Sequence, residues 1–117
     1  MNLLEFKKYC LNKKGAYEDF PFGPEPTVIK VASKIFALIN DKFGKFSLSL
    51  KCDPFVAQSF REQYSAVTSG YHLNKEHWNT IVLNESVPES EICWMIDHSY
   101  DLILKSLKKI EISQLNE

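Results

Sequence analysis

The stretch that decides the fold is FSLSLKCDPF, residues 46–55. Its first six residues alternate in polarity, so an extended chain turns Phe46, Leu48 and Leu50 to one side and Ser47, Ser49 and Lys51 to the other. This alternation predicts an antiparallel strand with one buried face and one solvated face. Asp53 and Pro54 then predict the start of a helix, because Asp is a good N-cap acceptor and Pro fits the first helical turn. A half-buried sheet therefore leads directly into a helix.

Segments with other periodicities flank this stretch on both sides. Apolar residues at helical spacing predict a helix over residues 3–14, which Gly15 ends. Three prolines within residues 19–26, DFPFGPEP, predict an ordered loop. Runs rich in β-branched and aromatic residues predict further strands at 27–31, 34–39, near 69–73 and at 78–83.

A long amphipathic helix is predicted at the end of the chain. Its apolar residues recur from Ile92 to Ile110, and Ser86 and Glu89 have the spacing of a capping box at its start. The element order is thus αβββαββα. We expect an α+β two-layer sandwich, with an antiparallel sheet of about five strands, helices on one sheet face and the other face open. We expect one domain over residues 1–117, with its core in 3–107 and a frayed C-terminal end.

Composition limits the classes of function. The chain has 117 residues, 44% of them hydrophobic and 25% charged, which is typical of an ordinary globular domain. The net charge of −1 combines +4 in residues 1–51 with −5 in residues 52–117. Proteins that depend on phosphate affinity usually carry a stronger positive excess. Any surface for nucleic acid must therefore be local.

The sequence predicts neither export nor a membrane span. Its longest apolar runs, 35–39 and 92–96, hold five residues each, whereas a spanning helix needs about 20. The N-terminal residues lack the basic-then-apolar order of a signal peptide. We expect a cytoplasmic monomer without a membrane partner. Cys10, Cys52 and Cys93 have no CxxC spacing, and we expect them to be reduced.

The densest chemistry lies in SGYHLNKEHWNTIVL, residues 69–83. His72 and His77 are five residues apart, a spacing that neither a helix nor a strand brings together, and two ligands leave a zinc site short. Cys52 with His77 is a conceivable catalytic pair at strand ends, yet no phosphate loop, nucleophile elbow or HExxH motif occurs. We therefore expect no metal, no cofactor and no catalytic residue.

Two interpretations of this segment remain open. In the first it contacts nucleic acid, with a lysine on phosphate, amide side chains at base edges and an aromatic ring as a stacking surface. The candidates for these three roles are Lys75, Asn74 or Asn79, and Tyr71 or Trp78. In the second interpretation residues 74–76 are only a polar turn, and Trp78 begins a strand and packs.

Strand alternation predicts where the tryptophan points. It sends Trp78, Thr80 and Val82 to one face of the sheet and Asn79, Ile81 and Leu83 to the other. The face with Ile81 and Leu83 has the character of a core. We therefore expect Trp78 on the solvated face, near Lys51.

An ordered set of segments resembles the MmcQ/YjbR family of small bacterial proteins. In chain order they are FPFGPE, KVASKIFALI, LSLKCDP, SGYHLNKEHWNTIVL and VPESEICWMIDHSYDL. The resemblance covers nearly the whole chain, from Phe6 to Leu107, and its most specific part is Gly-Tyr-His-x-Asn-Lys-x-His-Trp at Gly70 to Trp78. One departure is Ala32-Ser33, where the family tends to have glycine in the hairpin turn.

The resemblance implies a CyaY-like (frataxin-like) fold and DNA binding through a double-wing arrangement of β-hairpins. The binding residues that it implies are Lys51, Tyr71, His72, Asn74, Lys75, His77, Trp78 and Asn79. Ser99 and Tyr100 match the family's Ser-Tyr near the last helix, where packing against the sheet is expected. The alternative function is a protein- or ligand-binding domain that uses the open sheet face without nucleic acid.

Overall fold

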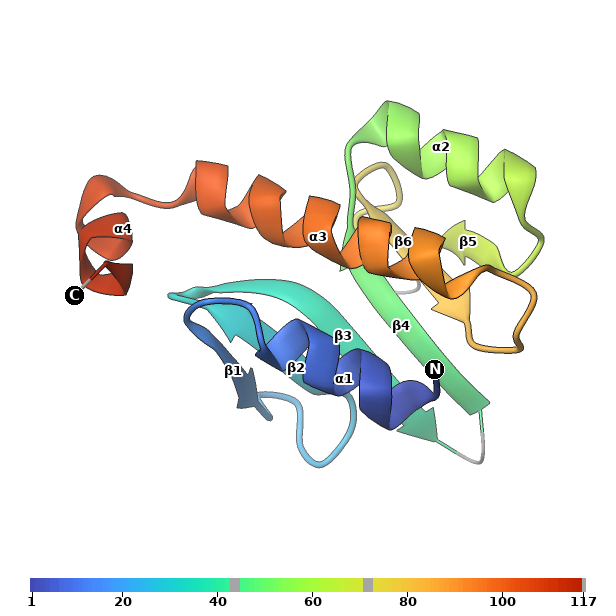
Figure 1. Ribbon diagram of the computed structural model, residues 1–117, viewed down its shortest axis with the longest axis horizontal. Coiled ribbons are helices and arrows are strands. Elements are labelled where there is room, and N and C mark those ends of the chain that lie inside the picture. The colour runs from blue at the N-terminus through green and yellow to red at the C-terminus, as the bar shows by residue number, and fades with distance from the viewer. Residues whose placement is uncertain (43–44, 71–72, 117) are drawn as a thin grey trace.

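The computed structural model describes residues 1–42, 45–70 and 73–116, and Figure 1 shows its helices lying against a twisted sheet. The helices are α1 (Leu3–Leu11), α2 (Pro54–Gln63), α3 (Glu89–Ser106) and α4 (Lys109–Leu115). The strands are β1 (Ala16–Asp19), β2 (Thr27–Val31), β3 (Lys34–Lys42), β4 (Lys45–Lys51), β5 (Val67–Ser69) and β6 (Trp78–Val82).

All strand pairs in the sheet are antiparallel, and the spatial order is β1-β2-β3-β4-β6-β5. Helices α1 and α3 run across one side of the sheet, with α2 beside β5 and β6 (Figure 1). The α+β architecture expected from the sequence is confirmed. The sheet has six strands, whereas about five were predicted. The additional strand is the edge strand β1, whose pairing with β2 was not predicted.

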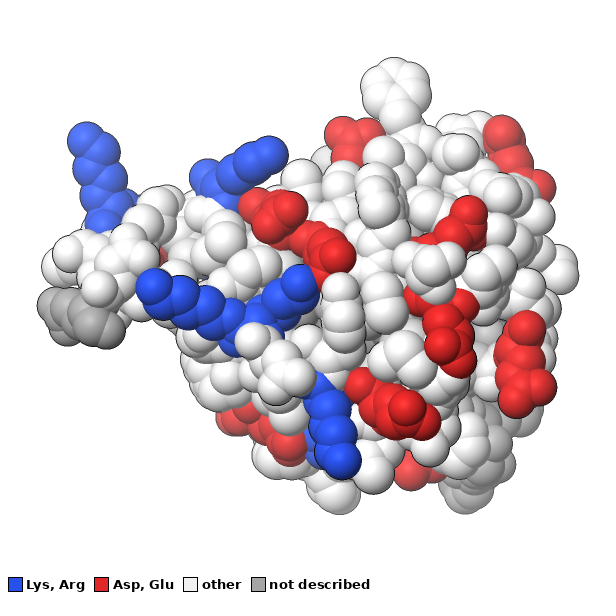
Figure 2. Space-filling model, in the orientation of Figure 1, with Lys and Arg blue, Asp and Glu red and all other residues white. Residues whose placement is uncertain are grey.

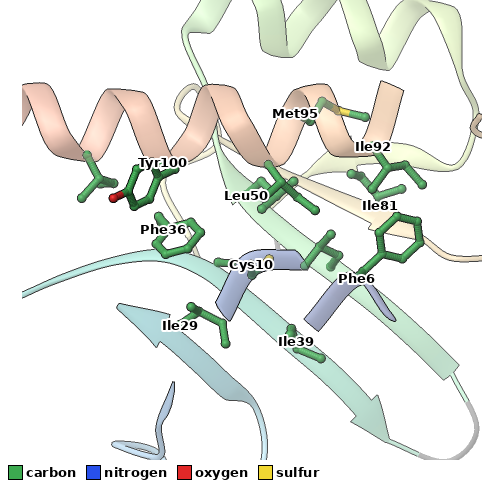
Figure 3. Packing of buried hydrophobic residues seen from close by; sticks show 14 of the residues in the cluster. Phe6, Cys10, Ile29, Phe36, Ile39, Leu50, Ile81, Ile92, Met95 and Tyr100 are labelled. Carbon is green, nitrogen blue, oxygen red and sulfur yellow. The ribbon is translucent and has the colours of Figure 1, made fainter. Parts of the chain in front are cut away.

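The core lies between the helices and one face of the sheet (Figure 3). Leu48 and Leu50 of β4 are buried in it, as their alternation predicts, together with Ile81 of β6. Phe46 is 41% exposed although it has the same parity, because its neighbour in the ladder is Asp41 near the end of the β3–β4 hairpin. The alternating pattern therefore identified the buried face correctly and missed where that face reaches solvent.

Several element boundaries differ from those expected: β3 continues to Lys42, beyond the predicted residue 39, and α3 ends at Ser106, short of Ile110. Helix α1 ends at Leu11, short of the predicted residue 14, and Gly15 adopts a positive φ of 78° that turns the chain into β1. Strand β5 spans Val67–Ser69, so it begins two residues earlier than predicted, and residues 71 and 72 of the predicted strand lie outside the described residues. The expected capping box at α3 is wrong, because Ser86 donates to Asn84 Oδ1 and Pro88 takes the N-cap position without a side-chain cap.

The C-terminal residues form α4 where we expected fraying. Glu111 Oε2 accepts hydrogen bonds from the backbone N–H and hydroxyl of Ser33 at 3.3 and 2.9 Å. Lys34 Nζ also donates to the hydroxyl and carbonyl of Ser106, at 3.1 Å each. The β2–β3 turn at Ala32-Ser33 is therefore bonded to α4, and Ala32 adopts a positive φ of 54° at the position where the family resemblance led us to expect glycine.

Strand β3 contains a bulge that joins the sheet to α3. The register shifts so that Ile29 pairs with Ala37 while Lys30 pairs with Ile35, which leaves Phe36 as the extra residue. The β3–β4 ladder ends one step further, at Ala37 and Leu50. Ser99 of α3 fills the gap, since its hydroxyl donates to Phe36 O at 2.6 Å and accepts from the Lys51 N–H at 3.0 Å.

Tyr100 strengthens the same junction. Its ring packs edge-on against Phe36 with ring centroids 5.4 Å apart, and its hydroxyl donates to the Lys14 carbonyl at 2.5 Å. The Ser-Tyr pair therefore does pack against the sheet, as expected, and it also satisfies backbone groups that the strands leave unpaired.

We predict that Ser99→Ala lowers the free energy of unfolding by about 2–4 kcal/mol, because it leaves two backbone groups without a partner at a fully buried position. Urea unfolding of both proteins measures the loss. The matched control is Ser59→Ala on the exposed side of α2, with an expected change within about 0.5 kcal/mol. Equal stabilities of the two variants would contradict the bridging role of Ser99.

Candidate functional site

The polar segment before β6 is a hydrogen-bonded turn. Asn74 organises it, because its side-chain Oδ1 accepts from the Glu76 N–H at 3.0 Å and its carbonyl accepts from the His77 N–H at 3.2 Å. Asn74, Lys75 and Glu76 are all exposed. Tyr71 and His72, which the family motif also implies as binding residues, lie outside the described residues.

Arg61 of α2 fixes this turn to the rest of the domain, and sequence reasoning missed it. Its Nε donates to Asn79 Oδ1 at 2.6 Å, and its Nη2 donates to the carbonyls of Lys75 and, at 3.3 Å, Trp78. A planar guanidinium can reach several acceptors in this way, whereas a lysine ammonium cannot. The chain has one arginine, and that was the only signal in the sequence that could have pointed to it.

Asn79 has a structural role and offers nothing to a ligand at the surface. It is only 1% exposed, and it lies on the core side of the sheet opposite Leu50. Its Nδ2 donates to Ala57 O at 3.1 Å while its Oδ1 accepts from Arg61. Of the two amide residues proposed as base readers, Asn74 alone therefore has an exposed side chain.

Trp78 and Lys51 are directly opposite each other in the β4–β6 ladder. Their parity places both on the sheet face turned away from the main core, as strand alternation predicts, and each side chain is partly exposed. We call this side of the sheet the open face. Further along it, the hydroxyls of Ser49 and Thr80 bond to each other at 2.8 Å across the same two strands.

The open face is not accessible to solvent along its whole width, because some of its side chains on β2 and β3 are buried. Val28 and Leu38 have the parity of this face, yet they are 0% and 8% exposed and lie outside the main core cluster. The exposed Thr68 of β5 lies in the same row of cross-strand neighbours as Ser49 and Thr80. The accessible part of the open face is therefore the part formed by β4, β6 and β5, next to the turn at residues 74–76.

Three consecutive amides hold the end of β4 in place. The Lys51 N–H donates to Ser99 Oγ at 3.0 Å, the Cys52 N–H to His77 O at 2.7 Å and the Asp53 N–H to His98 Nε2 at 3.1 Å. Asp53 also caps α2 through its side chain, which accepts from Phe55 and Val56, as the sequence predicts. Helix α3, helix α2 and the polar turn therefore meet at residues 51–53.

The chemistry at Cys52 is unlike that of a reactive nucleophile. The residue is 3% exposed, and burial, together with the nearby Asp53 carboxylate, raises the pKa of its thiol to about 11. A thiol with such a pKa remains protonated near neutral pH, and the thiolate is the nucleophilic form. Within the described residues, no three His, Cys, Asp or Glu side chains are grouped so that they could hold a metal ion.

Charge is unevenly distributed over the helix-covered side (Figure 2). Lys and Arg side chains gather there over α4 and the C-terminal end of α3, whereas Asp and Glu predominate around α2 and the N-terminal part of α3. An anionic ligand would be repelled from the acidic part. In the chain as far as the structure describes it, no helix has the length and hydropathy needed to cross a bilayer.

The fold and the site together define a small α+β domain. Its polar turn is held by hydrogen bonds from Arg61 and lies beside the accessible part of the open face. The model of the YjbR family matches residues 11–102, and the chain belongs to this family. It is 37% identical over 100 residues to YjbR of Escherichia coli K12, covering 86% of this chain and 85% of that protein. It is also 31% identical over 109 residues to YyaQ of Bacillus subtilis, covering 81% and 92% of the two chains.

Solved structures show the same fold. The crystal structure of Deinococcus radiodurans protein DR2400 superposes with a TM-score of 0.89 at 30% identity, covering 98% of this chain and 88% of that one. A Pseudomonas syringae protein gives a TM-score of 0.75 at 29% identity, covering 87% and 98%. These likenesses confirm the family and the fold expected from the quoted segments.

We predict that Arg61→Ala loosens the polar turn. The variant loses the hydrogen bonds to Asn79, Lys75 and Trp78, and the expected cost is about 2–3 kcal/mol in the free energy of unfolding. Hydrogen exchange should become faster at the Glu76 and His77 amides. Gln63→Ala, an exposed change on the same helix, is the control. Unchanged exchange in Arg61→Ala would contradict the proposed anchoring.

We also predict that His98 makes stability depend on pH. Burial lowers its pKa below the ordinary value, against smaller raising effects of Asp53 and Asp101. The unfolded chain therefore takes up a proton, near pH 6.5, before the folded chain does. The stability contributed by neutral His98 is complete above that pH and is lost as the pH falls.

Urea unfolding between pH 7.5 and 5.5 tests this, with His98→Gln as the reference protein. The original protein should lose more stability than the variant on acidification, because protonation removes the acceptor that the Asp53 N–H uses. If the free energies of unfolding of the two proteins differ by the same amount at every pH in this range, the prediction is wrong.

Proposed function

We propose that this protein is a small binding domain without catalytic activity, and that it binds DNA with the polar turn at residues 74–76 and the adjoining open face. The observation that carries the proposal is the Lys51–Trp78 cross-strand pair on that face, with the exposed Lys75 in the turn that precedes it. The family resemblance supports the same segment, since its most specific motif is Gly70 to Trp78.

The side chains of this surface suit contacts with a nucleic acid. A partly exposed tryptophan offers its ring for stacking on a base, and the two lysines supply positive charge for phosphates. Asn74 is exposed, but its Oδ1 is already bonded to the Glu76 N–H, so its amide nitrogen is the group that can reach a ligand. The hydroxyls of Ser49 and Thr80 bond to each other, and we assign them no contact.

The proposed surface is smaller than a double wing. The β2–β3 turn is bonded to α4 through Ser33 and Glu111, so this hairpin tip has a partner within the chain. The tip of the β3–β4 hairpin falls in residues 43–44, outside the described range. The proposal therefore rests on the polar turn at residues 74–76 and on the open-face side chains of β4 and β6. Few phosphates are contacted, in keeping with the net charge of −1.

We predict DNA binding that weakens with salt, with a slope near −3 for log K against log salt if about three or four phosphates are neutralised. Titration of fluorescently labelled duplex and single-stranded DNA at low and moderate salt measures the slope. The absence of binding to both DNAs at micromolar protein and low salt would contradict the proposal. A stoichiometric protein partner that co-purifies without nucleic acid would favour the alternative.

Two variants test the assigned residues. Lys75→Ala should keep the fold, because this exposed turn residue buries little surface. It should weaken DNA binding and make the slope of log K against log salt less steep by about 1. Trp78→Ala should also weaken DNA binding while costing under about 3 kcal/mol of stability. Lys105→Ala, exposed near the end of α3, is the charge-matched control and should bind as the original protein does. Unchanged binding in Lys75→Ala and Trp78→Ala would mean that the segment is scaffold.

A further inference from the structure

A separate cavity of about 940 Å³ lies where α1 begins, beside the β3–β4 hairpin and the link from β6 to α3. Its apolar lining comes from all of these elements: Phe6, Ile39, Phe46, Val82, Leu83 and Ile92. Phe46 and Val82 are 41% and 45% exposed, so the cavity presents apolar surface to solvent. The volume falls within the range of about 300–1,000 Å³ that is usual for small-molecule sites.

The polar part of this cavity is strongly acidic. Five carboxylate residues line it, namely Glu5, Glu25, Asp41, Glu85 and Glu89. Among the residues whose side chains the structure describes, the positive groups in the lining are Lys7 and the amino terminus, and both are already paired: Lys7 Nζ lies 3.2 Å from Glu18 and the terminal amine contacts Glu89. Figure 2 likewise shows acidic side chains gathered on the side of the molecule where α1 begins.

Glu85 is held at this cavity in an unusual backbone conformation. Its φ of 69° is positive, a region that non-glycine residues rarely adopt and that costs about 1 kcal/mol or more. The side chain of Asn84 stabilises the turn, because its Oδ1 accepts from the N–H and hydroxyl of Ser86 at 3.1 and 2.5 Å. Val87, two residues after Glu85, is buried and also lines the cavity. The turn therefore places an exposed carboxylate at the edge of an apolar hollow.

We propose that this cavity binds a small organic cation, an amine with an apolar body. The apolar lining would take up the hydrocarbon part, while Glu85 and Asp41 would face the ammonium group. An anion of the same shape would be repelled by the carboxylates, and a neutral analogue would lose the charge attraction. The cavity lining contains none of the residues assigned to DNA contact, which are Lys51, Asn74, Lys75 and Trp78, so either proposal can fail without the other.

The test uses three probes with the same phenylbutyl body: 4-phenylbutylamine, 4-phenylbutanol and 4-phenylbutyrate. Titration into the isotopically labelled protein, followed by two-dimensional NMR, gives both the affinity and the location. The amine should bind most tightly, with the largest shifts at the amides of Ile39, Val82, Glu85 and Ile92. Its affinity should fall with added salt.

Two variants test how much each carboxylate contributes to binding of the amine. Glu85→Asn removes the carboxylate, and asparagine tolerates a positive φ well, so the variant should be at least as stable and should bind the amine about five-fold more weakly. Asp41→Asn tests the second carboxylate independently. Glu62→Gln, exposed on α2 and absent from the lining, is the control and should leave binding unchanged.

Three results would overturn the proposal. The first is equal or tighter binding of the alcohol or the carboxylate than of the amine. The second is shifts that map away from the cavity, and the third is no binding of the amine at millimolar concentration.

Discussion

The hydroxyl of Ser99 is the contact on which the rest of the structure depends. Strand β4 pairs with β3 only as far as Leu50, and the bulge in β3 leaves the Phe36 carbonyl without a strand partner. Ser99 donates to that carbonyl and accepts from the Lys51 N–H, so one buried side chain completes both strands at the point where their ladder ends. It also sets the position of α3, since Tyr100 packs on Phe36 one residue later. A hydroxyl is required here because the two backbone groups need a donor and an acceptor at the same atom.

The same junction positions the candidate binding surface. Lys51 uses its backbone to bond α3 and directs its side chain to the open face, opposite Trp78. The next amide, that of Cys52, donates to the His77 carbonyl after the polar turn, and Arg61 donates to the carbonyls of Lys75 and Trp78. The backbones of the partly exposed Lys51 and Trp78 are thus held by hydrogen bonds, which lowers the entropy cost of ordering these residues around a ligand. Because each support is a hydrogen bond to a backbone group, the surface chemistry can vary without loss of the fold.

The sequence predicted what depends on local periodicity. The alternation in β4, the helix start at Asp53-Pro54 and the face on which Trp78 lies all followed from residue spacing. Strand β1 was not predicted, because its sequence AYED has no alternating apolar pattern. The strand forms by pairing with β2. Strand alternation placed Asn79 on the core side, but its hydrogen bond to Arg61 was not predicted, since the two residues are 18 apart and no spacing rule links them. Helix α4 is bonded through Glu111 to Ser33, and the end of α3 is bonded through Ser106 to Lys34; both pairs lie over 70 residues apart in the sequence.

Amide hydrogen exchange at residues 51–53 tests the central claim most directly. If Ser99 Oγ, His77 O and His98 Nε2 accept from these three amides, all three should exchange as slowly as the Leu48 and Leu50 amides of the strand interior, although they lie beyond the last β3–β4 pair. The Lys51 amide should be among the slowest, because Ser99 is fully buried. Fast exchange at Lys51 and Cys52, at the rate of an exposed loop, would contradict the account, since the strand end would then be free of α3 and of the polar turn.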